Sequence, residues 1–265
     1  MGALARCLVL CALASASAAG SDRHVSLGIF DGTDAAEHEF PSQVFVVSLI
    51  NEPWRGNSFY RTCGGTIISA KWILTAAHCV NGSARTEVRA GSSARGPAWR
   101  PGKLLAKRRI VHEKYRLYGR NDNNAADDIA LVELELPLDG RRMAAVPIAK
   151  GKPARRRGVV IGWGLTEQGD FAKILQKLDV NIIPCPEKTP KAICIRSAPG
   201  SGVCSGDSGG PLLVDGVLHG VASYIDLADK TLEPNDHCGD GRAWGVYMRV
   251  ASYRRWIQRH TGIAP

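Results

Sequence analysis

The chain contains the stretch Gly206-Asp207-Ser208-Gly209-Gly210-Pro211, which says more about its fold and chemistry than any other part. A serine hydroxyl is a poor nucleophile at neutral pH, so acyl transfer needs a base to take its proton and a carboxylate to orient that base. The segments Thr75-Ala76-Ala77-His78-Cys79 and Asp127-Asp128-Ile129-Ala130-Leu131 offer a histidine and an aspartate. Glycines beside Ser208 let backbone N–H groups turn toward a developing oxyanion. The pattern therefore predicts nucleophilic acyl transfer.

The order of the three segments, histidine first, aspartate second and serine last, closely resembles that of the chymotrypsin-like (trypsin-fold) serine proteases. The resemblance runs from about Ile29 to about His260 and includes Gly162-Trp163-Gly164 and Gly245-Val246-Tyr247. It implies an all-β fold of two six-stranded antiparallel β-barrels with a C-terminal helix. It also implies a serine-type endopeptidase whose catalytic groups lie in the cleft between the barrels.

The resemblance gives each matching residue a role. Ser208 attacks the substrate carbonyl, His78 accepts and later returns the proton, and Asp128 orients His78. The N–H groups of Gly206 and Ser208 hold the oxyanion. Asp127 matches no role, and we expect it to be solvated.

An alternative treats Gly206 to Gly210 as the G-x-S-x-G elbow of an α/β-hydrolase, whose base follows the nucleophile as His219, His237 or His260. An elbow serine opens a helix, whereas Pro211 to Val217 has the pattern of a short apolar strand and turn. The elbow also leaves the segment around His78 without a purpose.

The N-terminal segment has the three-part layout of a signal peptide. It carries Arg6, an apolar run from Cys7 to Ala14, and small residues from Ser15 to Gly20. The apolar run is too short to span a membrane. We therefore expect a secreted protein, extracellular or periplasmic, with a signal peptide at 1–20, a propeptide at 21–28 and a protease domain at 29–265. By resemblance, its two lobes cover about 29–142 and 149–250.

Many short apolar runs, such as Val44–Leu49 and Val159–Ile161, indicate mostly β structure. Only the C-terminal end has a helical pattern. There we expect Ser252 to cap a helix that turns Trp256 and Ile257 inward.

Six cysteines follow the signal segment: Cys63, Cys79, Cys185, Cys194, Cys204 and Cys238. Six cysteines allow fifteen pairings, and free thiols or a zinc site are alternatives. No C-x-x-C pair occurs, and export to an oxidising compartment favours disulfides. The resemblance implies the pairs Cys63–Cys79, Cys185–Cys194 and Cys204–Cys238.

The resemblance also locates the primary substrate pocket, whose base is the residue six before the nucleophile. Here that residue is Gly202, and with Val203 it makes an uncharged floor, against which an unpaired Lys or Arg costs on the order of several kcal/mol. The implied walls are Ser223, Tyr224, Ile225 and Gly245. Ile225 shortens the pocket in an elastase-like way that favours Val or Ala, whereas Gly245 leaves a medium pocket for Leu or Met open. We expect the acidic loop from Asp226 to His237 to lie in solvent, although it could instead wall the pocket.

In this family, cleavage before an Ile-Val-Gly-Gly-type start frees an α-amino group that pairs with the aspartate preceding the nucleophile. Here Ile29-Phe30-Asp31-Gly32 occupies that place and the partner is Asp207. Because Leu27-Gly28 precedes the cut, the activator is not a trypsin-like enzyme, and its identity stays open.

The formal net charge is +9, and basic residues cluster at Lys107–Arg109, Arg155–Arg157 and Arg254–Arg255. Such clusters bind anionic surfaces or glycans in some proteins, although mere solubility is the simpler interpretation. No nucleic-acid module is apparent. The segment Ala90–Lys103 has no acidic residue for a calcium site. We expect no metal and no cofactor.

The alternative function is a catalytically silent relative that binds anionic surfaces or glycans through these clusters. The presence of His78, Asp128 and Ser208 argues against it. We expect a monomer that acts on polypeptide substrates, with a protein inhibitor as a further candidate partner. Asn81-Gly82-Ser83 is a glycosylation sequon.

Overall fold

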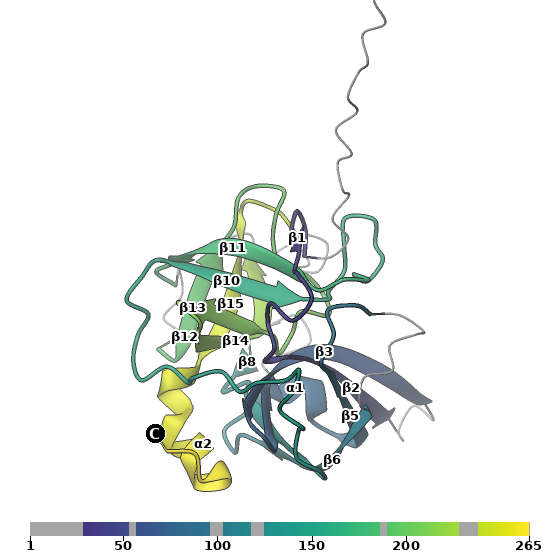
Figure 1. Ribbon diagram of the computed structural model, residues 1–265. Helices are drawn as coiled ribbons and strands as arrows, with labels where there is room; N and C mark the ends of the chain where they lie inside the picture. Colours follow the sequence, from purple (N-terminus) through teal and green to yellow (C-terminus); the bar gives the residue numbers. More distant parts are fainter. Residues whose placement is uncertain are drawn as a thin grey trace, which may run out of the picture.

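The computed structural model describes residues 29–52, 57–95, 103–117, 125–185, 190–227 and 238–264. These residues form two antiparallel β-barrels, one above the other in Figure 1, and a short C-terminal helix. The expected all-β fold of two six-stranded barrels with a C-terminal helix is therefore confirmed. No helix in this part of the chain is long and apolar enough to cross a membrane.

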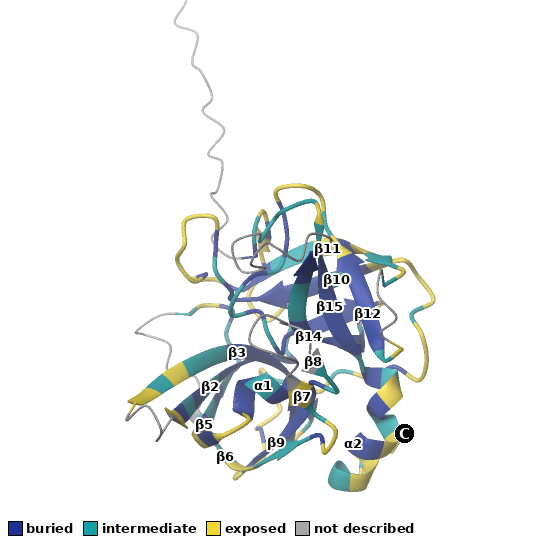
Figure 2. Ribbon diagram, turned by 180° about the vertical axis from the view of Figure 1, so that it is seen from behind, coloured by how far each residue is buried: buried dark blue, intermediate teal, exposed yellow. Residues whose placement is uncertain are grey.

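The first barrel is a closed sheet with the strand order β2-β3-β4-β9-β6-β5. Its strands are β2 (Gln43–Glu52), β3 (Asn57–Ser69), β4 (Trp72–Thr75), β5 (Ser83–Ala90), β6 (Lys103–Val111) and β9 (Ala130–Leu134). In β5, Thr86, Val88 and Ala90 are buried and the residues between them are not, which is the alternation of a strand with one face in the core. Buried strands appear dark blue in Figure 2.

A chain of buried hydroxyl groups ties the first barrel to the short helix α1 (Ala77–Val80). The Thr86 Oγ1 atom lies 3.0 Å from both Ser48 Oγ and Ser83 Oγ. Ser83 in turn donates to the Val80 carbonyl over 2.8 Å. Because buried hydroxyls are costly unless hydrogen-bonded, this chain fixes where α1 sits on the barrel.

The second barrel has the strand order β11-β10-β13-β14-β15-β12 and closes through the pairing of β11 with β12. Its strands are β10 (Arg157–Gly162), β11 (Gln176–Ile183), β12 (Ala192–Arg196), β13 (Pro211–Val214), β14 (Val217–Leu227) and β15 (Ala243–Arg249). Pro211 begins a strand, as expected, so the residues after Ser208 are not the helix that an α/β-hydrolase elbow requires.

The N-terminal residues of the domain belong to the second barrel, and the expectation that the first lobe starts at Ile29 is wrong. Strand β1 (Thr33–Asp34) pairs with β11, and Ile29 is buried in the same apolar cluster as Val160 and Tyr247. Pairing with a distant strand therefore places Thr33 and Asp34 in the second lobe, although the first lobe follows them directly in the sequence.

The two barrels approach each other closely. The rings of Phe45 and Trp163 meet edge to face with centroids 5.9 Å apart, and the Trp163 indole N–H donates to the Ser93 carbonyl over 2.9 Å. A Cβ atom at Gly64 would lie 2.9 Å from the Gly210 Cα atom, so the backbones can approach there because residue 64 is glycine.

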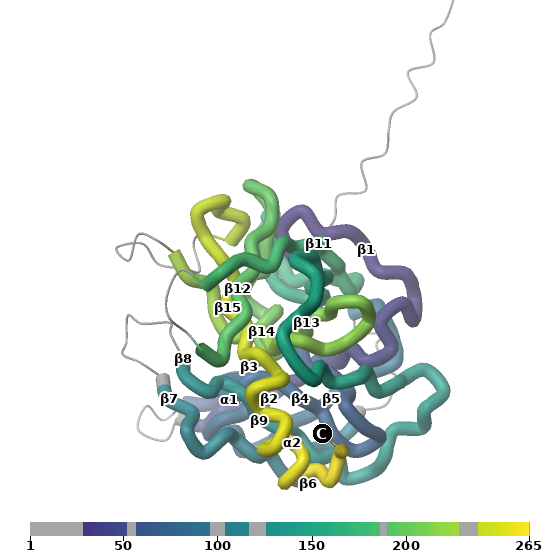
Figure 3. The backbone as a smooth tube through the Cα atoms, turned by 90° about the vertical axis from the view of Figure 1, so that its left-hand side faces the viewer, coloured from purple at the N-terminus to yellow at the C-terminus, as the bar shows by residue number. Residues whose placement is uncertain are grey.

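The chain ends in the 3-10 turn η3 (Val250–Tyr253) and helix α2 (Arg254–Thr261). Trp256 and Ile257 are buried as predicted, but the prediction that Ser252 caps the helix is wrong. Because the 3-10 turn starts at Val250, Ser252 lies inside it, and its hydroxyl accepts a hydrogen bond from Arg249. Trp256 donates to the Glu113 carboxylate over 3.2 Å, so α2 lies against the first barrel (Figure 3).

A short ribbon of β7 (Arg116–Leu117) and β8 (Ala125–Ala126) precedes the loop that leads into β9. The connection between the barrels runs from β9 to β10 without a strand of its own. It is hydrogen-bonded to both barrels, through Val146 N–H to the Ile67 carbonyl and Ala149 N–H to the Leu218 carbonyl, each over 3.0 Å.

Candidate active site

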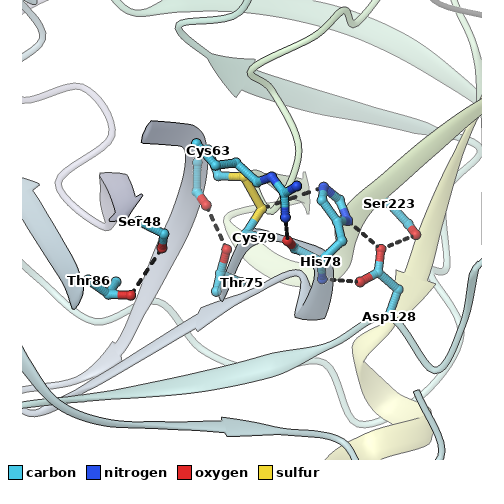
Figure 4. The surroundings of a disulfide bond; sticks show 10 residues. Ser48, Cys63, Thr75, His78, Cys79, Thr86, Asp128 and Ser223 are labelled. Atoms are coloured by element: carbon cyan, nitrogen blue, oxygen red, sulfur yellow. Dashed lines mark hydrogen bonds and ion pairs between the residues drawn. A yellow bond between two sulfur atoms is a disulfide. The ribbon is translucent and has the colours of Figure 1, made fainter. Parts of the chain in front are cut away.

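His78 lies on α1, directly after the buried strand β4. Its imidazole Nδ1 atom is 2.8 Å from Asp128 Oδ2, and its backbone N–H donates to Asp128 Oδ1 over 2.9 Å (Figure 4). A carboxylate accepts but does not donate, so Nδ1 carries the proton and Nε2 is left as the acceptor. The histidine is therefore held in the tautomer that a general base requires.

Asp128 has no exposed surface, and its carboxylate also accepts a hydrogen bond from the Ser223 hydroxyl over 2.5 Å. Burial by itself raises the pKa of Asp128, but the charge of His78 and the hydrogen bonds from His78 and Ser223 outweigh burial and hold this pKa below its ordinary value. Asp128 therefore stays ionised at neutral pH.

Asp127, expected to be solvated, is instead largely buried. Its side chain is 11% exposed, and its carboxylate lies 2.5 Å from the Lys191 Nζ atom. Lys191 lies directly before β12 of the second barrel, so this ion pair joins the two lobes beside Asp128.

Ser208 lies in the loop between β12 and β13, where glycines allow a close approach to the first barrel. Gly209 has a φ angle of 78°, and a Cβ there would lie 2.2 Å from Thr75 Oγ1. The Gly64 N–H donates to the Ser208 carbonyl over 2.8 Å. Gly64 follows Cys63, whose disulfide partner Cys79 follows His78, so Ser208 and His78 are brought to the same part of the cleft.

The backbone N–H groups of Gly206 and Ser208 have no hydrogen-bond partner among the residues that the structure describes. Gly206 has a φ angle of 99°, a conformation that glycine adopts without strain. Two unpaired N–H groups in one turn suit the binding of a developing oxyanion. Within the same ranges, Ser208 Oγ makes no hydrogen bond to His78; such bonds often form only when substrate binds.

The predicted pocket exists as a cavity of about 20 Å³ in the second barrel, large enough for one water molecule. Gly202, Val203, Ile225 and Gly245 line it, as the sequence analysis predicts. Ser223 and Tyr224 do not. The hydroxyl of Ser223 is turned to Asp128, and a shift of register between Ala222 and Tyr224 changes the direction of the strand there.

Sequence reasoning missed Asp240, a charged residue of this cavity. Its side chain is 16% exposed, and its carboxylate accepts hydrogen bonds from the Arg242 guanidinium, the shortest over 2.7 Å. A signal for it existed, because Asp240 follows Cys238, and the implied Cys204–Cys238 bond brings this segment close to Gly202.

The sequence model of the family described as Trypsin matches residues 29–257. The chain belongs to the trypsin family. It is a serine-type endopeptidase, and the three catalytic candidates, the unpaired N–H groups and the pocket all lie within the matched residues.

Individual relatives of this endopeptidase differ in name. It is 30% identical over 263 residues to a chymotrypsin of Phaedon cochleariae, which covers 89% of this chain and 83% of the relative. It is also 30% identical over 252 residues to chymotrypsin-like elastase family member 1 of Felis catus, and this match covers 86% of this chain and 88% of the relative. The structure of HL collagenase matches with a TM-score of 0.75 and 26% identity over 89% of this chain and 100% of the other. These relatives share the family and carry three different names.

Asp207, the predicted partner of the α-amino group, is a fully buried carboxyl in this protease. It accepts hydrogen bonds from the N–H groups of Gly164 over 2.8 Å and Cys204 over 2.9 Å. Burial raises the pKa of Asp207 to about 7, although these two bonds lower it. No cation lies beside it in the described part of the chain.

Ile29 lies in the same region. The Gly202 N–H donates to the Phe30 carbonyl over 3.0 Å, and Tyr247, which shares an apolar cluster with Ile29, has its pKa raised by burial and by the charge of Asp207. In the full-length chain the Ile29 nitrogen is a peptide nitrogen and carries no charge.

Three disulfides join Cys63–Cys79, Cys185–Cys194 and Cys204–Cys238, the same pairs that the resemblance implies. Within the described ranges, one group of potential metal ligands lies close together, and it consists of Cys63, His78 and Cys79. Because its two sulfurs are bonded to each other, only the histidine remains to bind an ion.

The three basic clusters lie on separate elements, and two of them contain ion pairs. Lys107 and Arg108 on β6 form ion pairs with Glu133, and Arg155 pairs with Asp215. These contacts reduce the positive charge that these two clusters present.

The raised pKa of Asp207 predicts how stability changes with pH. The folded state retains a proton below pH 7 that the unfolded state, with a pKa of 3.8, releases. The free energy of unfolding of the full-length Ser208→Ala chain should therefore fall between about pH 4 and pH 7, by up to roughly 4 kcal/mol from this group. Urea denaturation across this range measures the slope.

Two controls isolate the contribution of Asp207. Full-length Ser208→Ala with Asp207→Asn should lack the decrease, and a Ser208→Ala chain beginning at Ile29 should show a smaller one, because its amino group supplies a cation. If the free energy of unfolding changed with pH by the same amount in all three proteins, the decrease could not be assigned to Asp207.

Proposed function

We propose that this protease is a secreted endopeptidase that hydrolyses peptide bonds through Ser208, His78 and Asp128, after small or medium aliphatic residues. The observation that carries the catalytic assignment is the buried Asp128 carboxylate, hydrogen-bonded to His78 and Ser223, close to the loop of Ser208. We further propose that it acts as a monomer on polypeptides, with a protein inhibitor as a candidate partner.

The positions of Ser208, His78 and Asp128 suit hydrolysis of a peptide bond. Ser208 Oγ attacks the substrate carbonyl and its proton passes to His78 Nε2, the ring nitrogen that Asp128 leaves free. The N–H groups of Gly206 and Ser208 bind the negative oxygen. His78 then gives the proton to the departing amine. Water takes the place of the amine, loses a proton to His78 and attacks the acyl carbon, and the bond to Ser208 Oγ breaks as His78 returns the proton to this oxygen. Losing one oxyanion donor typically lowers turnover by about 10²–10³.

The pocket supports an aliphatic preference. Its floor of Gly202 and Val203 carries no charge, and the branched side chain of Ile225 lines the pocket. Asp240, the acidic residue of its described lining, is already paired with Arg242. A substrate Lys or Arg would therefore lack a free carboxylate, at a cost on the order of several kcal/mol.

Buried Asp207 supports activation by cleavage. We propose that residues 1–20 are a signal peptide, that residues 21–28 are a propeptide, and that cutting before Ile29 frees the amino group that neutralises Asp207. Residues 1–28 lie outside the described residues. A buried carboxyl with two backbone donors and no cation is the group that such a cut would satisfy.

The first test concerns the nucleophile. A fluorophosphonate should label the mature protein at Ser208, and Ser208→Ala should abolish both labelling and peptidase activity. His78→Ala should be nearly as damaging, because the catalytic groups act as a unit. Peptidase activity that survives in Ser208→Ala, measured with purified protein, would exclude this serine.

The second test concerns activation. N-terminal sequencing of the active enzyme should begin at Ile29, and Asp207→Asn should lose most of the activity while the protein is still exported. Fully active enzyme that retains residues 21–28 would show that no new amino terminus is needed.

The third test concerns the pocket. A peptide library should be cleaved after Val or Ala, with Leu or Met tolerated and Lys, Arg and large aromatic residues disfavoured. Ile225→Gly should enlarge the pocket and shift preference toward Phe, Tyr or Leu. One methylene changes discrimination by only about 1–3 kcal/mol, so rejection of Lys and Arg is the stronger expectation. Strong cleavage after Arg would mean that Asp240 or the acidic loop binds the substrate, and the aliphatic preference would be wrong.

A further inference from the structure

Arg61 is fixed beside the catalytic histidine. It lies on β3, two residues before Cys63, and its Nη1 atom donates a hydrogen bond to the carbonyl oxygen of His78. Its guanidinium carbon is 5.5 Å from the centroid of the Phe59 ring. The side chain is half-buried, so it is held in place and still reaches solvent.

The charge of Arg61 is not neutralised within the part of the chain that the structure describes, where no carboxylate pairs with it and only Nη1 is hydrogen-bonded. Arg85, on β5 of the same barrel, differs in this respect, because its Nη2 atom lies 3.3 Å from a carboxylate oxygen of Glu87. A guanidinium with unused N–H groups is the side chain best suited to a carboxylate, which it binds through two parallel hydrogen bonds.

The position of Arg61 decides which part of a substrate it meets. The pocket for the residue on the acyl side lies in the second barrel, between Gly202 and Ile225. The residues on the other side of the cleaved bond leave past His78, since His78 protonates the departing amine. Arg61 and the Cys63–Cys79 disulfide come from the first barrel and border His78, away from the acyl pocket. Figure 4 shows the disulfide beside the imidazole ring.

We propose that Arg61 forms a subsite on the leaving-group side that selects an acidic side chain at the first or second residue after the cleaved bond. This inference rests on the proposed function. An acidic residue there supplies the carboxylate that Arg61 lacks, whereas a lysine at the same place is repelled.

Internally quenched peptides that share one acyl side test the proposal, with Glu, Gln or Lys at the first or second residue after the cleaved bond. The kcat/KM for Glu should exceed that for Lys by about three- to tenfold at low salt, the range of a partly exposed ion pair. The ratio should shrink in 1 M salt, where the Debye length is about 3 Å.

The variant Arg61→Gln replaces the guanidinium with a shorter, uncharged amide, so the Glu-to-Lys ratio should fall close to one. Arg61→Glu should reverse the preference. Arg85→Ala removes the same charge from the same barrel and should leave the ratio as it is in the unmodified enzyme.

An ester substrate with no residue after the cleaved bond separates this role from a structural one. Arg61→Gln should lower kcat/KM for the Glu peptide more than for the ester, because the ester offers no carboxylate after the cleaved bond. An equal loss on the ester and on all peptides would show that Arg61 only positions His78, and the subsite would be wrong.

Failure of the inference can be told apart from failure of the proposed function. An enzyme that cleaves the peptides with no charge preference after the bond lacks the subsite but remains the proposed protease. A protein that cleaves none of them and is not labelled by a fluorophosphonate at Ser208 fails as a protease, and the subsite fails with it.

Discussion

The buried carboxyl of Asp207 is the constraint on which the second barrel and the catalytic loop depend. It joins the Gly162-Trp163-Gly164 segment to the Ser208 loop, because the N–H groups of Gly164 and Cys204 both donate to it. A Cβ atom at Gly162 would lie 2.0 Å from one oxygen of this carboxyl, and one at Gly164 would lie 2.4 Å from the other. These two glycines therefore make room for a carboxyl group. The Ser208 loop is therefore held in shape by a carboxyl group whose burial is unfavourable without a cation beside it.

The site is shared between the lobes. Asp128, from the first barrel, accepts hydrogen bonds from His78 of the same barrel and from Ser223 of the second. Lys191 and Asp127 form a second connection close by, and Trp256 of the C-terminal helix donates to Glu113 in the first lobe. The candidate site therefore lies where the lobes are attached, so a change in their packing alters the distances between His78, Asp128 and Ser208.

The sequence predicted the type of reaction better than it predicted which distant residues lie in contact. Serine, histidine and aspartate in their segments indicate acyl transfer, but the hydrogen bond between His78 and Asp128 spans 50 residues, which no local pattern reveals. For the same reason Ile29 to Asp34 were assigned to the wrong lobe, since Thr33 pairs with Lys177, far along the chain. Ser252 has the residue type of a helix cap, but a preceding 3-10 turn moved the start of α2. Asp240 was missed because no strand pattern places it beside the pocket, and only the Cys204–Cys238 pairing links its segment to Gly202.

The exchange of terminal segments between the lobes bears on how the chain folds as it is synthesised. The first residues of the domain, Ile29 to Asp34, pair with the second barrel, and the last, in α2, pack on the first. The strands of the first barrel can form early, but the loop of Asp128 gains its contacts with Ser223 and Lys191 only after the second barrel has been made. The second lobe is complete only once β15 has been made, and the first gains its contact with Trp256 later still. The contacts around Asp128 that join the two lobes therefore form late in synthesis.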